Sequence, residues 1–200
     1  PANTRGAQGV QPPPQKHGKN AGEMLTGAIK AAILLNTEPA FDAAAGAKGL
    51  EQADMVITLS PFKANLDISD VLLPVAPFTE TSGTFVNAEG RVQSFHAVVK
   101  PLGETRPAWK VLRVLANLLE LPGFDYESSQ DVLTAAIGAE TKEVPSALRS
   151  NITKVAAKVP ENEAAEPVTA SIYQLDGIVR RATSLQLTAD ARLAREGGAA

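Results

Sequence analysis

The chain has 200 residues, a formal net charge of -3, 44% hydrophobic residues and only 4% aromatic residues. Its Lys and Arg residues are scattered, so the basic patch that nucleic-acid binding needs is absent, and no apolar run reaches the roughly 20 residues of a membrane span. With no Cys and two His residues, the chain cannot form disulfides or hold an iron–sulfur cluster through thiolates, and a zinc site is disfavoured.

The first part of the chain predicts a linker followed by alternating strands and helices. Residues 1–27 are expected to form a loop or linker, because the first twenty are rich in Pro, Gly, Gln, Lys and Asn. The apolar run Ala31–Leu35 predicts a strand covered on both faces. The Ala-rich stretch Pro39–Gln52 predicts a helix, and Asp54–Ser60 and Asp70–Ala76 predict two further strands. This strand–helix–strand order indicates a parallel sheet.

The middle of the chain predicts a hairpin and a buried helix. Thr84–Asn87 and Arg91–Phe95 can pair as antiparallel strands, with Gly90 available for a positive φ in the turn. A helix is expected from Pro107 to about Leu121, where Pro and Gly follow. Its polar residues form one narrow stripe, so we expect the helix to be buried on more than one side.

The last third of the chain predicts helices joined by an acidic linker. Ser128–Gly138 is typical of a helix and Ser146–Lys158 of a weaker one. Residues 160–170 have the composition of a linker. Beyond it, apolar residues at helical spacing over 172–182 predict a last helix, in a tail that either docks on partner surfaces or stays mobile.

These elements predict the α/β class: a Rossmann-like three-layer domain with parallel strands, a hairpin-containing loop segment and a helical C-terminal extension. Because the chain begins with Pro1 and no signal peptide is recognisable, we interpret it as a fragment whose upstream part is missing. The expected division is a linker over 1–27, an α/β domain over 28–122, a helical extension over 123–159, and a linker with a C-terminal docking segment over 160–200.

Four motifs in one order resemble a known superfamily. They are Ala53–Thr58, Asp70–Ala76, Glu80–Gln93 and Gly103–Leu112, and together they resemble the molybdopterin oxidoreductases. Within that superfamily, these motifs are most similar to the large iron–sulfur subunit of the bacterial NADH–quinone oxidoreductase, respiratory complex I. The segment Asp176–Ser184 also resembles the C-terminal segment of those subunits.

This resemblance implies a structural role in a larger electron-transfer enzyme. The complete subunit would carry 4Fe-4S clusters on its N-terminal part, outside this sequence, and would help to pass electrons from NADH to quinone. This fragment would hold no cofactor and no catalytic residue. Its implied partners are the other subunits of the peripheral arm, with no nucleic acid and no direct membrane span. Its implied location is the cytoplasmic side of the bacterial inner membrane, in a translocase that associates with that membrane.

Two other function classes stay open from the sequence. The first is a fragment of a molybdopterin-dependent oxidoreductase, such as a formate dehydrogenase alpha subunit. The second is a nucleotide-binding module, which is disfavoured because no Gly-x-Gly-x-x-Gly follows the first strand. Molybdenum or tungsten content separates the enzyme from the scaffold.

Two groups of polar residues follow predicted strands, where α/β folds place ligands. The turn-rich segment offers a vestigial pterin or phosphate site, although turn and backbone roles explain the same residue types. Its members are Glu80, Thr84, Asn87, Glu89 and Arg91. The residues after the first strand, Asn36, Thr37 and Glu38, are interpreted as a helix cap. No catalytic or metal-ligating residue is expected.

Overall fold

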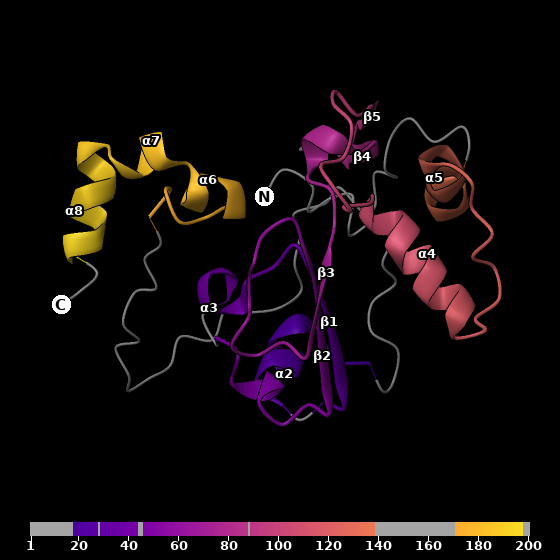
Figure 1. Cartoon of the computed structure of the whole chain (residues 1–200), viewed down its shortest axis with the longest axis horizontal. Coiled ribbons are helices and arrows are strands. Elements are labelled where there is room, and N and C mark those ends of the chain that lie inside the picture. Colours follow the sequence, from indigo (N-terminus) through magenta and orange to yellow (C-terminus); the bar gives the residue numbers. More distant parts are fainter. Residues whose placement is uncertain (1–17, 28, 44–45, 88, 139–170, 198–200) are drawn as a thin grey trace. The chain divides into compact units, whose positions relative to one another are not determined.

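A computed structural model of the chain describes residues 18–27, 29–43, 46–87, 89–138 and 171–197, with side chains up to 193. The fold is α/β, as the sequence predicts: it contains a parallel three-stranded sheet, an antiparallel hairpin and helices (Figure 1). The predicted helix over 146–158 and the predicted linker over 160–170 lie outside the described residues. The chain divides into two compact units, and β2 and β3 contribute residues to both. We call them the sheet unit (19–58, 63–72 and 157–200) and the hairpin unit (1–18, 59–62 and 73–156).

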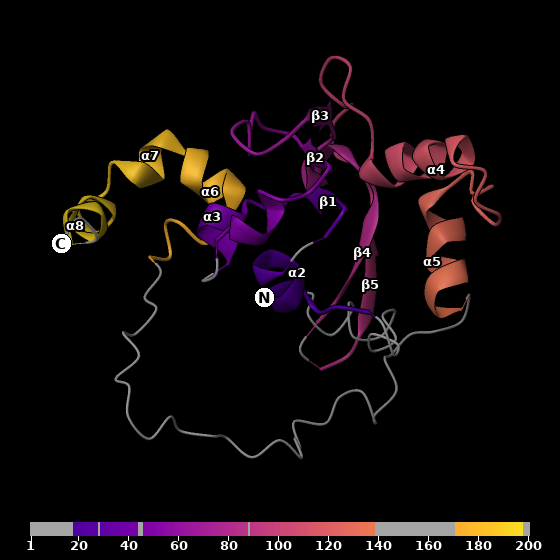
Figure 2. The ribbon, with the colours of Figure 1, turned by 90° about the horizontal axis from the view of Figure 1, so that it is seen from below.

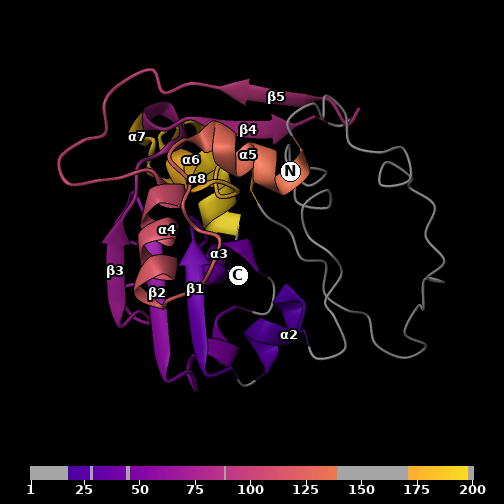
Figure 3. The ribbon, with the colours of Figure 1, turned by 90° about the vertical axis from the view of Figure 1, so that its right-hand side faces the viewer.

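The sheet is built from β1 (Ala31–Leu35), β2 (Met55–Ser60) and β3 (Val71–Pro74). Their order is β1-β2-β3, with β2 in the middle (Figure 3). All three strands confirm the sequence prediction to within two residues at each end. Apolar, β-branched runs form them because such side chains pack well on a pleated surface.

The core of the sheet unit lies on one side of β1. Leu34, Leu50 and Val56 are buried together, and partly buried apolar side chains pack against them, namely those of Leu25, Ile29, Ala32, Ala47, Ala53 and Ile68. The opposite side of β1 differs from the prediction, since Ile33 is 50% exposed and Leu35 is 40% exposed. The expectation that this strand is covered on both faces is therefore wrong for the described residues.

The expected linker over 1–27 ends in a helix. Helix α2 (Ala21–Thr26) begins at Asn20, whose side chain accepts a hydrogen bond from the Glu23 N–H at 2.9 Å, while the Glu23 carboxylate accepts the Asn20 N–H at 2.8 Å. This reciprocal capping box satisfies two backbone donors that a helix start otherwise leaves open. A linker composition in the preceding residues hides that local signal.

The helix expected over Pro39–Gln52 is broken. Helix α3 spans only Pro39–Asp42, Ala43 is extended, and a short 3-10 helix, η1 (Lys48–Leu50), follows Gly46, whose φ is 62°. The reason is tertiary packing. A Cβ on Gly49 would lie 2.3 Å from the Leu25 carbonyl oxygen of α2, so the two backbones approach as closely as only Gly allows.

This close approach predicts a large effect of one methyl group. Gly49→Ala is expected to destabilise the chain by about 2 kcal/mol or more, because the new Cβ meets backbone that cannot rotate away. Gly22→Ala is the matched control, since its Cβ would meet only the Asn20 side chain at 3.3 Å. Chemical denaturation followed by circular dichroism measures both variants. Equal stability of the two variants would contradict the packing of η1 on α2.

The hairpin unit contains the antiparallel pair that the sequence predicts. Strand β4 (Gly83–Val86) pairs with β5 (Val92–Phe95), and Val86 lies opposite Val92 (Figure 2). Gly90 takes a φ of 93° in the turn, which confirms the expected use of glycine. The Phe85 and Phe95 rings stack with their centroids 5.0 Å apart. A short 3-10 helix, η2 (Phe78–Glu80), precedes the hairpin.

Two helices follow the hairpin. Helix α4 (Ala108–Leu118) and helix α5 (Ser129–Ile137) confirm the predicted positions, and α5 begins with a capping box on Ser128. In the part of the chain that the structure describes, Ala116 is the one buried residue of α4 and Leu118 is 77% exposed. Burial of α4 between the sheet and other parts of a larger protein therefore stays a prediction. The helix also ends earlier than expected, because Glu120 adopts a positive φ of 55°.

The C-terminal segment forms three short helices in place of the one expected over 172–182. They are α6 (Gly177–Arg181), α7 (Thr183–Gln186) and α8 (Ala189–Gly197). Asp176 starts α6 late because its carboxylate accepts the N–H groups of Ile178 and Val179. None of the helices described in this structure has the length and apolar character to cross a membrane.

Candidate functional site

The first predicted group of polar residues lies in and beside the β4–β5 hairpin. The Glu80 carboxylate accepts the Leu102 N–H at 2.9 Å, the Thr84 hydroxyl bonds the Ser94 hydroxyl at 3.0 Å, and the Asn87 side chain accepts the Arg91 N–H at 2.9 Å. The side chains of Glu89 and Arg91 lie at the surface. These bonds support the hairpin and its neighbouring loop. A vestigial ligand site in this segment stays a prediction.

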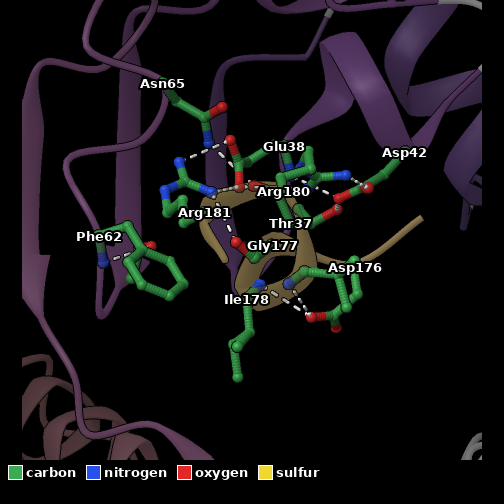
Figure 4. Close-up of polar contacts among 12 residues, drawn as sticks. Thr37, Glu38, Asp42, Phe62, Asn65, Asp176, Gly177, Ile178, Arg180 and Arg181 are labelled. Carbon is green, nitrogen blue, oxygen red and sulfur yellow. Dashed lines mark hydrogen bonds and ion pairs between the residues drawn. The ribbon is translucent and has the colours of Figure 1, made fainter. Parts of the chain in front are cut away.

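The second group lies at the carboxyl end of β1, inside the sheet unit (Figure 4). The chain turns there because Asn36 adopts a positive φ of 50°, a conformation that Asn tolerates better than most residues. Asn65, also at a positive φ, donates from its side chain to the Thr37 carbonyl oxygen at 2.9 Å. These contacts fix the loop that leads into α3.

Glu38 stands at the N-cap position of α3 but does not cap it through its side chain. Asp42, one turn later, accepts the Glu38 backbone N–H at 2.7 Å and the Thr37 hydroxyl at 3.2 Å. The prediction that the side chains of residues 36–38 cap the helix is therefore wrong. Instead, the Asp42 side chain, inside the helix, accepts the backbone N–H of Glu38 at the start of the helix. The Glu38 carboxylate makes no cap and is available to other partners.

Two consecutive arginines from α6 meet these carboxylates. Arg181 binds Glu38 with both terminal nitrogens, at 2.8 Å and 3.0 Å. Arg180 bridges two acids, with one nitrogen 3.1 Å from Glu38 and the other 3.0 Å from Asp42. A planar guanidinium suits such forked contacts, and a lysine ammonium does not reproduce them.

Further contacts hold Arg180 in place. Its guanidinium carbon lies 4.8 Å from the centroid of the Phe41 ring, and it also donates to the Gln174 carbonyl oxygen. The Arg180 side chain is 6% exposed and that of Glu38 is 12% exposed. We call Glu38, Phe41, Asp42, Arg180 and Arg181 the arginine cluster.

The cluster changes the acidity of its members. The hydrogen bond from Arg181 lowers the pKa of Glu38 below its usual value, helped by the bond and charge of Arg180, although burial opposes this. Burial would lower the pKa of Arg180, but hydrogen bonds and charges from Asp42 and Glu38 raise it overall. Glu38 and Arg180 therefore stay charged at neutral pH.

The lowered pKa of Glu38 predicts that the cluster loses stability at low pH. Because the pKa of Glu38 is lowered in the folded chain, its carboxylate stabilises the folded cluster at pH values above the ordinary pKa of 4.5. This stabilisation is lost as the pH falls through the lowered pKa. We expect the side-chain carboxyl resonance of Glu38 to titrate with a midpoint below pH 4.5 in an NMR experiment. Glu38→Gln should abolish that transition, and Asp190→Asn should preserve it. A midpoint at or above 4.5 would contradict the ion pairs.

Sequence reasoning missed Phe41, Asp42, Arg180 and Arg181. One signal was available: Glu38 and Asp42 are four residues apart, which places two carboxylates on one face of a helix where they repel unless cations approach. The partner cations lie 138 or more residues away in the sequence, so no local pattern identifies them.

The arginine cluster is suited to holding segments of the chain together through ion pairs. Its carboxylates are paired with guanidinium groups, and the described residues contain no group of three or more His, Cys, Asp or Glu side chains placed to hold a metal ion. Such an arrangement binds charge and fixes geometry, and the chemistry it can supply is ion pairing and hydrogen bonding.

Comparison with known proteins shows similarity to one family and to several curated bacterial proteins. The profile of the molybdopterin oxidoreductase family matches residues 2–118, more than half of the chain. A putative formate dehydrogenase of Staphylococcus aureus (strain bovine RF122 / ET3-1) is 39% identical over 77 residues, which is 38% of this chain and 8% of that protein. A probable oxidoreductase of Bacillus subtilis (strain 168) is 40% identical over 70 residues, which is 35% of this chain and 7% of that protein.

A second putative formate dehydrogenase, from Staphylococcus aureus (strain MRSA252), is 32% identical over 84 residues, 42% of this chain and 8% of that protein. The matched segments thus span less than a tenth of the length of these curated relatives.

Proposed function

We propose, from the premise that this chain belongs to the molybdopterin oxidoreductase family, that it is a structural segment of an oxidoreductase of the formate dehydrogenase kind. The observation that supports this most is the similarity to proteins named putative formate dehydrogenase, at 39% identity over 77 residues. In this proposal the whole enzyme oxidises a small substrate, and the segment contributes folded surface to it.

The end of β1 does not fit the anionic cofactor that the family name implies. A phosphate-bearing pterin needs free hydrogen-bond donors, as helix starts and arginines often supply. Here the Glu38 N–H donates to Asp42, and the terminal nitrogens of Arg180 and Arg181 bind Glu38 and Asp42. The two carboxylates also balance the two guanidinium groups, so the cluster offers an anion no net positive charge. The residues at the end of β1 therefore hold the loop and α6 in place, and no catalytic step is assigned to them.

A second candidate is the one implied by the motifs, the large iron–sulfur subunit of NADH–quinone oxidoreductase. The segment Asp176–Ser184, which carries part of that resemblance, contacts Glu38 of the same unit through Arg180 and Arg181. That observation favours a structural role for the segment over a dispensable tail. The named relatives, however, favour the formate dehydrogenase kind.

Metal and pterin analysis of the full-length protein distinguishes the two candidates. The first proposal predicts stoichiometric molybdenum or tungsten, together with pterin, and formate-dependent reduction of an artificial electron acceptor. A preparation from cells grown without molybdate and tungstate is the control and should be inactive. A protein that contains iron and sulfide but neither metal, and that assembles into an NADH-oxidising complex, would contradict the first proposal and support the second.

A further inference from the structure

The C-terminal segment of the sheet unit is held against Glu38 and Asp42 by contacts that it cannot make alone. We call residues 171–193 the strap. Its helices α6 and α7 have only 5 and 4 residues, and isolated helices shorter than about 12 residues are marginal in water. Their order must therefore come from packing and from side-chain bonds. The contacts between α6 and the carboxyl end of β1 supply part of that order.

The strap also has an internal support. Gln186 is buried, and its amide nitrogen donates to the carbonyl oxygens of Tyr173 at 3.0 Å and Val179 at 2.8 Å. The Gln174 side chain donates to the Gln186 side-chain oxygen at 3.3 Å. These bonds join the turn before α6 to α7, so the strap presents its two arginines as a preformed pair.

The receiving surface has the chemistry of a guanidinium receptor. Glu38 and Asp42 provide two carboxylates one helical turn apart, and the Phe41 ring provides an aromatic face on which Arg180 lies at 4.8 Å. Carboxylate pairs and aromatic faces are the groups that bind guanidinium ions best. Without cations, the two carboxylates would repel each other and leave buried charge.

We infer that Glu38, Phe41 and Asp42 form a binding site for an arginine pair, and that the strap of the same chain fills it through Arg180 and Arg181. The filled site closes the carboxyl end of β1, where parallel α/β folds otherwise bind small ligands. This inference goes beyond the proposed function, since it holds for either oxidoreductase candidate.

Hydrogen exchange of the intact 200-residue chain tests this site. In the native chain we expect slow exchange for the strap amides bonded within α6 and α7, including those of Arg180 and Gln186. Glu38→Gln/Asp42→Asn removes both carboxylates, and strap exchange should become faster by about tenfold or more. Amides of β2 report on the fold and should keep their protection.

A charge-matched control separates the site from net charge. Glu51→Gln/Asp67→Asn removes two exposed carboxylates of the sheet unit and should leave strap exchange unchanged. If the first double variant also loses β2 protection, Arg180→Gln/Arg181→Gln provides the same test from the strap side without altering the receiving surface. Fast strap exchange in the native chain would overturn the inference. So would strap protection that survives in Arg180→Gln/Arg181→Gln.

Discussion

Leu59→Ala is expected to lower the free energy of unfolding by about 2–5 kcal/mol. Leu59 lies in the central strand β2 and is 0% exposed, so truncation leaves a cavity among side chains that are fixed by the sheet. Urea denaturation followed by circular dichroism measures the loss.

Leu66→Ala is the matched control for this prediction. Leu66 follows β2 in the chain and is 62% exposed, so the same truncation should change stability by less than about 0.5 kcal/mol. Similar losses in the two variants would show that β2 is not the buried centre of the sheet.

Arg180→Met is expected to release the strap. The substitution keeps an unbranched apolar side chain but leaves the carboxylates of Glu38 and Asp42 without their bridge, which costs about 3 kcal/mol or more in the docked state. Undocking relieves that cost, because the freed carboxylates regain water. The loss should therefore appear as rapid hydrogen exchange over residues 176–187, with little change in the rest of the sheet unit.

Arg192→Met provides the corresponding control, since Arg192 is an exposed arginine of the same strap. Its exchange pattern should match that of the native chain. Arg180→Lys should give partial release, because one ammonium cannot bridge two carboxylates as a guanidinium does. If Arg180→Met and Arg192→Met behave alike, ion pairing with Glu38 and Asp42 does not hold the strap.

Much of the fold could be predicted because its signals are local. The apolar runs that form β1 and β2, the hairpin with Gly90 at its turn and the start of α4 after Pro107 each depend on neighbouring residues. The α2 start was equally local, in the Asn20–Glu23 capping box, and was missed because the residues before it have a linker composition. Helix α3 was overestimated because Ala-rich propensity ignores the approach of Gly49 to α2.

The candidate site could not be predicted from local patterns. Its acids come from residues 38 and 42 and its bases from residues 180 and 181, so the site exists only after the two ends of the described chain meet. The polar residues of the hairpin were better placed in the sequence, directly after a strand, yet their observed bonds are within the hairpin and its loop. Loop position alone does not distinguish a ligand site from a supported turn.

A double-mutant cycle between Glu38 and Arg180 tests the central claim most directly. The free energy of strap docking is obtained from the exchange rates of the Arg180 and Gln186 amides, or of their equivalents in the variants, for the native chain, Glu38→Gln, Arg180→Gln and the double variant. If the strap fills a specific site, the two substitutions should be coupled by about 1–3 kcal/mol, because either one alone removes the same contact. Additive effects, within about 0.5 kcal/mol, would contradict the arginine cluster as the anchor of the strap.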